Sequence, residues 1–91
     1  MLGKIIYNEQ EQSGDYKWLG IASYMTANFK STFGDCAEII ATTAVKMILK
    51  KHPNDADYFQ TFCYVWPNGK KTKFWIINDV THYTALLPSD Y

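Results

Sequence analysis

The sequence predicts a small domain of the α+β class, in which two helices pack on one face of an antiparallel β-meander. The 91 residues allow a single hydrophobic core, so we expect one domain over residues 1–91. Between residues 15 and 52 the apolar residues recur with helical spacing. From residue 58 onward they alternate with polar residues, as in strands. The predicted order of elements is β-α-α-β-β-β.

The first part of the chain is predicted to form a strand and a helix. Residues 2–7 are a short β-prone run, and the polar residues 8–15 that follow indicate an exposed loop. Beyond Asp15, apolar residues occupy the positions of one helical face. They are Trp18, Ile21, Ala22, Met25 and Phe29. Gly20 lies inside this run and costs a helix about 1 kcal/mol relative to alanine.

Residues 35–52 carry clearer signals for a second helix. Asp35 is expected to cap its start, with Glu38 three residues later as in a capping box. The Lys-Lys-His run at 50–52 suits the negative end of the helix dipole, and Pro53 ends the helix. One apolar stripe is expected to pack on the sheet. It consists of Ala37, Ile40, Ala41, Ala44, Val45 and Ile48.

Residues 58–66 and 70–77 are predicted to form a hairpin. The dipeptide Asn68-Gly69 between them is the strongest short-range signal for a two-residue type I′ turn. Such a turn fixes how the two strands pair. The pairs it implies are Pro67 with Lys70, Tyr64 with Lys73, Cys63 with Phe74 and Phe62 with Trp75.

This pairing divides the side chains of the hairpin between the two faces of the sheet. The face without formal charge is expected to pack against the helices. Its members are Phe59, Thr61, Cys63, Val65, Thr72, Phe74 and Ile76. The other face is expected to be open to solvent. Its members are Gln60, Phe62, Tyr64, Trp66, Lys71, Lys73, Trp75 and Ile77.

A last strand is predicted over residues 80–87, which Pro88 ends. The dipeptide Asn78-Asp79 before it is typical of a tight turn. A turn at that position would place His82 opposite Trp75 in the neighbouring strand, and Tyr83 opposite Phe74.

Composition limits the functions that fit. Nine lysines balance nine carboxylates, and the chain contains no arginine, the side chain best suited to bidentate capture of phosphate or guanine. A dedicated nucleic-acid-binding protein is therefore disfavoured. The apolar runs are too short to span a bilayer, and the start of the chain does not have the pattern of a signal peptide. We expect a cytoplasmic protein without a membrane partner, in which Cys36 and Cys63 are free thiols.

The open face of the hairpin allows more than one interpretation. Lysine stems lying over aromatic rings would simply shield a wet sheet face. Alternatively, the face is a recognition surface for another protein, because tyrosine and tryptophan are enriched at interfaces. The candidate binding residues are Tyr64, Trp66, Lys71, Lys73, Trp75 and His82. A third interpretation is that bases of a single-stranded nucleic acid stack on the same rings.

Catalysis would have to use Cys36 and His82. The Asp-Cys-Ala start of the second predicted helix, with a histidine on a later strand, resembles the Asp-Cys-Ser helix start of papain-like cysteine hydrolases. The resemblance implies that Cys36 is the nucleophile and that His82 is its base. Ala37 stands where the family has serine, and no clear polar partner follows His82. The alternative is that Cys36 is only a small residue near the edge of the helix.

No metal or other cofactor is expected. A site built from Cys36, His52, Cys63 and His82 would need a short-spaced pair such as Cys-x-x-Cys. His52 is better explained as a cation at the end of a helix, and Cys63 as a core residue. The sequence has no glycine-rich phosphate loop and no G-x-S-x-G motif.

Non-catalytic binding to another protein is the function that these observations favour. Small domains with much aromatic surface and no catalytic motif are typical of phage and mobile-element accessory proteins that inhibit a host defence factor by stoichiometric binding, an analogy from size and composition. The alternatives are a papain-like cysteine hydrolase and a single-stranded nucleic-acid-binding protein. Exposed strand edges are compatible with either a monomer or a homodimer.

Overall fold

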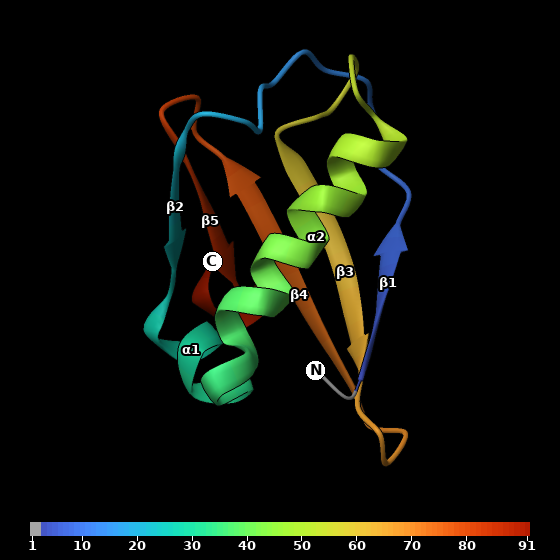
Figure 1. Cartoon of the computed structure of the whole chain (residues 1–91), viewed down its shortest axis with the longest axis vertical. Coiled ribbons are helices and arrows are strands. Elements are labelled where there is room, and N and C mark those ends of the chain that lie inside the picture. Colours follow the sequence, from blue (N-terminus) through green and yellow to red (C-terminus); the bar gives the residue numbers. More distant parts are fainter. Residues whose placement is uncertain (1–2) are drawn as a thin grey trace.

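The computed structural model describes residues 3–91 and contains one five-stranded sheet with both α-helices on the same face (Figure 1). The strands are β1 (Lys4–Asn8), β2 (Ala22–Met25), β3 (Phe59–Val65), β4 (Lys71–Asn78) and β5 (His82–Leu86). The helices are α1 (Ala27–Phe33) and α2 (Ala37–Lys51), with 3-10 turns at Gly34–Cys36 and Pro88–Asp90. This arrangement confirms the predicted α+β class. The strand predicted over 2–7 is present as β1, although Leu2 lies outside the described residues.

The strands follow one another in the order β1-β3-β4-β5-β2 across the sheet. Neighbours are antiparallel except for β2, which pairs with β5 in parallel orientation. In Figure 1, α2 crosses in front of β3 and β4, while α1 lies at the end of the sheet near β2 and β5. One face of the sheet is therefore covered by helices, and the other is not.

The apolar stripe predicted for the second helix is confirmed. All six of its members are buried on α2: Ala37, Ile40, Ala41, Ala44, Val45 and Ile48. They pack on a core whose largest fully enclosed side chains include three phenylalanines, Phe29, Phe62 and Phe74. The rings of Phe62 and Phe74 stack with their centroids 5.1 Å apart across β3 and β4. Within residues 3–91 there is no helix of the length and hydrophobicity that crossing a bilayer requires.

The predicted cap at Asp35 is wrong. Cys36 is the N-cap of α2, and no side chain caps the helix there. The reason is that the chain arrives from a 3-10 turn, so its backbone is already helical before α2 starts. The capped helix is α1, where the Thr26 hydroxyl accepts a hydrogen bond of 3.1 Å from the backbone N–H of Phe29. Gly34, with φ of 55°, ends α1.

The helix predicted from Asp15 to Phe29 is also wrong over most of its length. Trp18 lies in an irregular segment, Ala22–Met25 form β2, and the helix begins only at Ala27. Gly20 has φ of 77°, a conformation that an α-helix cannot contain. The helical spacing of the apolar residues in this segment is coincidental. Pairing with β5, a contact between segments about sixty residues apart, overrides the local pattern.

The hairpin between β3 and β4 has a three-residue loop, Pro67-Asn68-Gly69, instead of the predicted two-residue turn. The backbone N–H of Trp66 donates to Lys70 O at 2.7 Å, and that of Gly69 donates to Trp66 O at 2.9 Å. Gly69 has φ of 89°. Proline favours the second position of a type I turn, and glycine favours the left-handed residue that follows such a turn. Pro67 therefore shifts the loop by one residue.

The shift changes every pair along the hairpin. The observed pairs include Phe62 with Phe74, Cys63 with Lys73, Tyr64 with Thr72 and Val65 with Lys71. The alternation of β4 is as predicted, with Phe74 and Ile76 facing the helices. The alternation of β3 is the reverse of the predicted one, because a slip of one residue moves each side chain to the other face.

The second hairpin differs from its prediction as well. Its turn lies at Val80-Thr81, since the N–H of Asp79 donates to His82 O at 2.8 Å. Trp75 therefore pairs with Leu86, not with His82, and Asn78 pairs with Tyr83. Asn78 belongs to the strand because its buried side chain has partners there. Its Nδ2 donates to Lys17 O at 2.7 Å, and its Oδ1 accepts from the N–H of Val80 at 2.7 Å.

Candidate functional site on the open face of the sheet

The face of the sheet that turns away from both helices is the candidate site, and we call it the open face. Pairing and alternation assign its members from all five strands. They are Lys4, Ile6, Asn8, Ala22, Tyr24, Phe59, Thr61, Cys63, Val65, Lys71, Lys73, Trp75, Ile77, His82, Thr84 and Leu86. Most of the central positions are only half-buried, although many are apolar.

Two of the predicted binding residues face the helices instead. Tyr64 is 3% exposed, and its hydroxyl accepts a hydrogen bond of 2.9 Å from the backbone N–H of Gly3. Trp66 stacks on Phe33 of α1, with ring centroids 5.7 Å apart, and its Nε1 donates to Thr72 Oγ1 at 2.9 Å. The predicted orientation of both side chains is therefore wrong. They close one end of the core, and the register shift in β3 is the cause.

Of the other predicted binding residues, Lys71, Lys73 and Trp75 follow one another along β4 on the open face, whereas His82 lies apart from them on β5. Trp75 occupies its middle on β4. The edge of Phe59 meets its ring at a centroid distance of 5.0 Å, and the exposed Tyr91 meets it at 5.7 Å. Leu86 pairs with it from β5 and is buried. Trp75 is thus the centre of an apolar patch.

Positive charge gathers at the end of the open face next to the Pro67-Asn68-Gly69 loop. Lys4 of β1 and Lys71 of β4 both pair with Val65, which lies between them on β3. Lys73 is one step further along β4, opposite Cys63. Within residues 3–91, none of these three ammonium groups forms an ion pair. Their charge remains available to a partner.

His82 lies at the opposite end of the open face. Its Nε2 is 3.3 Å from Asp79 Oδ2, and its ring is edge-on to Tyr24 at 5.1 Å. Cys36 is at the start of α2, packed against the core on the helix side of the sheet. The structure therefore does not bring Cys36 and His82 together. Cys63, predicted as core, is half-buried on the open face, and both cysteines are free thiols.

A polar cluster that no sequence motif indicated surrounds His52 at the end of α2. Glu9 Oε1 is 2.8 Å from Nε2 of His52, and Asp55 Oδ1 is 3.0 Å from Nδ1. Lys51 binds the other oxygen of Glu9 at 2.8 Å, and this hydrogen bond, with a smaller contribution from His52, lowers the pKa of Glu9. The cluster joins Glu9 to residues 51–55, more than forty residues away, so spacing alone could not have found it. Among residues 3–91 no three His, Cys, Asp or Glu side chains are arranged to hold a metal ion.

Tyr7 lies beside this cluster and belongs to a partly buried network of hydrogen bonds. Its hydroxyl donates to Gln60 Oε1, and Gln60 Nε2 donates to Gln10 Oε1 at 2.9 Å. Burial and then the charge of Glu9 raise the pKa of Tyr7 to about 12. Tyr7 is therefore protonated at neutral pH and acts as a hydrogen-bond donor. These hydrogen bonds hold the loop after β1 against β3, which is a structural role.

Comparison with protein families, with curated proteins and with solved structures finds no match to this chain. Sequence reasoning missed Phe59 and Val65 as members of the open face. The signal that could have found them is Pro67, because proline before Asn68-Gly69 favours the longer loop and thereby reverses β3.

Proposed function

We propose that this protein acts by binding another protein through the open face of its sheet. The observation that supports this proposal most is the position of Trp75, a partly exposed tryptophan at the centre of an apolar patch that neither α-helix covers. Tryptophans that dominate binding energies lie near the middle of interfaces and are surrounded by residues that exclude water. Phe59, Ile77 and Leu86 can provide that surrounding.

The distribution of charge gives the partner a chemistry. Lys4, Lys71 and Lys73 lie at one end of the open face without carboxylate partners among the described residues. A partner with an apolar centre and carboxylates on one side would match this surface, and the lysines would steer its approach. We also predict that the protein is a phage or mobile-element accessory protein and that such binding inhibits a host defence factor. This prediction rests on size and composition alone.

A single-stranded nucleic acid is the second candidate, because partly exposed rings and lysines share the open face. The zero net charge and the absence of arginine favour a protein partner. A papain-like cysteine hydrolase is not favoured, because Cys36 packs on the helix side of the sheet whereas His82 is on the open face.

Affinity capture from the native host, followed by titration of the purified partner, tests the proposal. Trp75→Ala is expected to weaken binding at least about 30-fold, the equivalent of about 2 kcal/mol. Lys71→Glu with Lys73→Glu should slow association and reduce its dependence on salt. The matched controls are on the outer side of α2. Ile39→Ala is the control for Trp75→Ala, and the double variant Lys46→Glu with Lys50→Glu is the control for the paired lysine variant. Both controls are expected to leave binding unchanged.

Two outcomes would contradict the proposal. Binding that survives Trp75→Ala and the paired lysine variant would place the partner elsewhere on the molecule. Salt-dependent binding of a labelled oligonucleotide, lost in the same variants, would favour the second candidate. Thermal melts of all variants separate loss of binding from loss of folding.

A further inference from the structure

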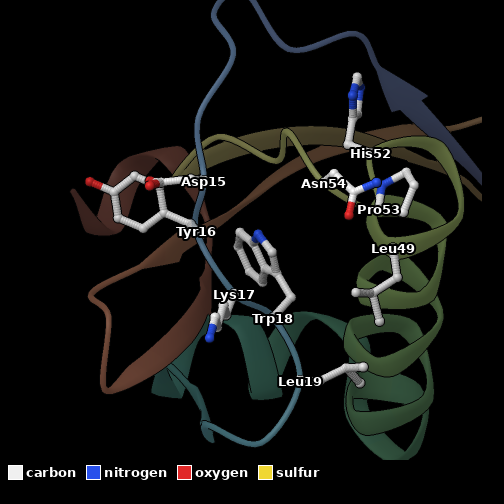
Figure 2. A pocket seen from close by; sticks show the side chains of 9 residues that line it. All are labelled: Asp15, Tyr16, Lys17, Trp18, Leu19, Leu49, His52, Pro53 and Asn54. Atoms are coloured by element: carbon white, nitrogen blue, oxygen red, sulfur yellow. The ribbon is translucent and has the colours of Figure 1, made fainter.

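A cavity of about 320 Å³ lies on the helix side of the molecule, between the segment 15–19 and the end of α2 (Figure 2). The residues that line it include Trp18, Leu19, Leu49, His52, Pro53 and Asn54. Its volume is at the lower end of the range of about 300–1,000 Å³ that is typical of small-molecule pockets. Because it is on the helix side, it is independent of the open face.

Trp18 is held firmly in one wall of this cavity. The backbone N–H groups of Gly14 and Tyr16 donate to Asp55 O at 3.0 Å and Ala56 O at 3.1 Å, which fixes the segment before it. Trp18 is 3% exposed, and its ring packs on Tyr83 of β5 with centroids 5.5 Å apart. The position of the indole is therefore set by the fold.

The indole nitrogen of Trp18 has no hydrogen-bond acceptor among the described residues. It is buried, and buried polar groups in folded proteins are nearly always paired, because an unpaired donor destabilises the folded state. Trp66 shows the usual solution in the same molecule, since its Nε1 donates to Thr72. Figure 2 shows the nitrogen edge of Trp18 turned toward the side of the cavity formed by Pro53 and Asn54.

The remaining groups around the cavity define which acceptor fits. Leu19, Leu49 and Pro53 give it apolar walls. Both ring nitrogens of His52 are already engaged by Glu9 and Asp55. The two charged residues at the rim, Asp15 and Lys17, are opposite in sign. The site thus offers one buried donor without a partner, next to apolar walls, and no excess charge.

We propose that this cavity binds a small neutral molecule with an apolar body and one carbonyl oxygen, which accepts a hydrogen bond from Trp18 Nε1. The apolar body packs between Leu49, Leu19 and Pro53. A charged ligand would lose its hydration without gaining an ion pair, so the site selects against it. The carbonyl group satisfies the donor that the fold leaves unpaired.

Nuclear magnetic resonance of the ¹⁵N-labelled protein tests this proposal directly, because the three tryptophans give separate indole N–H signals. The probes are acetophenone and α-methylstyrene, in which a methylene group replaces the carbonyl oxygen. We expect acetophenone to move the Trp18 signal downfield in a saturable manner, and to leave the Trp66 signal in place. The hydrocarbon is expected to bind about tenfold more weakly, because it leaves the donor unpaired.

Substitutions supply the second measurement. Trp18→Phe removes the N–H, and it should reduce the affinity for acetophenone to that for α-methylstyrene. Trp66→Phe removes an N–H that already has a partner, and it should leave the affinity for the ketone unchanged. If Trp18→Phe fails to fold, the comparison of the two probes on the unaltered protein decides alone. A Trp18 signal that acetophenone does not move, or equal affinity for both probes, would overturn the proposal.

Discussion

Replacing Val80 by glycine is expected to stabilise the protein, although most substitutions destabilise. Val80 is at the second hairpin turn with φ of 75°, and no other non-glycine residue between 3 and 91 has a positive φ. The N–H of Thr81 donates to Asp79 O at 2.9 Å, which closes a tight turn around Val80. A β-branched side chain strains the backbone in this conformation.

Three contributions determine how much Val80→Gly changes the free energy of unfolding. Residues forced into sparsely populated backbone conformations cost of order 1–3 kcal/mol, which glycine would relieve. Glycine adds flexibility to the unfolded chain, which costs about 0.4–1 kcal/mol. Val80 is 69% exposed, so the loss of its side chain removes little buried apolar surface. The net expectation is a stabilisation of about 0.5–2 kcal/mol.

Thermal unfolding measures this effect, because 1 kcal/mol shifts the midpoint by about 4–8 °C in a domain of this size. Val80→Ala is the matched variant. It removes the branch but keeps Cβ, so it should raise the midpoint less than Val80→Gly does. Thr81→Gly, the neighbouring position without positive φ, should lower the midpoint. If Val80→Gly lowers the midpoint as much as Thr81→Gly does, Val80 is not strained and the reasoning is refuted.

Three further predictions follow from single features of the fold. Gly69→Ala should destabilise by about 1 kcal/mol or more in denaturant titrations, because Gly69 has φ of 89° at the hairpin loop, whereas Asn68→Ala should cost less. Trp75→Ala should lower the melting midpoint much less than Phe62→Ala, which empties a fully buried position and should cost about 3–5 kcal/mol of stability. Equal losses of stability in the two variants would mean that Trp75 is a core residue. The pKa of Tyr7 is raised to about 12 in the folded protein, against 10.0 in the unfolded chain. Its contribution to the free energy of unfolding is therefore complete below pH 10 and is lost as the pH rises toward 12, so stability should fall in that interval, and should fall less in Tyr7→Phe. If the stability of Tyr7→Phe falls as steeply as that of the unaltered protein, Tyr7 is not the cause.

The parts of the fold that the sequence predicts well are those in which local and tertiary preferences agree. The stripe of α2 is one example, because each member has the spacing of a helical face and also faces the sheet. The alternation of β4 is another, since Phe74 and Ile76 are apolar and Lys71 and Lys73 are charged. In such segments a single pattern determines both the element and the direction of its side chains.

The segment before α1 shows why other parts could not be predicted. Trp18 and Phe29 are both buried, as the expected helical face requires, but Trp18 lies in an irregular segment and Phe29 in α1. The strand between them, β2, has only four residues and exists because β5 pairs with it. A partner so distant in sequence leaves no local signal. The cavity next to Trp18 depends on the same tertiary arrangement and was equally hidden.

The hairpin shows how one turn residue determines the candidate site. In the predicted register, the rings of Phe62 and Tyr64 would face water, whereas Thr61 and Cys63 would fill the core. In the observed register both rings are buried, at 0% and 3% exposure. Full burial of a large apolar side chain contributes about 1.5–3 kcal/mol. The two rings together therefore outweigh a difference of about 1 kcal/mol in strand or turn preference.

The burial of these two rings also explains why Pro67, more than Asn68-Gly69, determines the register of the hairpin. The longer loop that Pro67 favours is the one that lets β3 bury its aromatic residues while β4 keeps its lysines outside. The open face consequently loses Tyr64 and Trp66 and gains Phe59 and Val65. It changes from a mixed surface of rings and lysines to an apolar centre around Trp75 with positive charge at one end. We expect an apolar centre with charge at its border to favour a protein partner, because the centres of protein interfaces are depleted of charged residues.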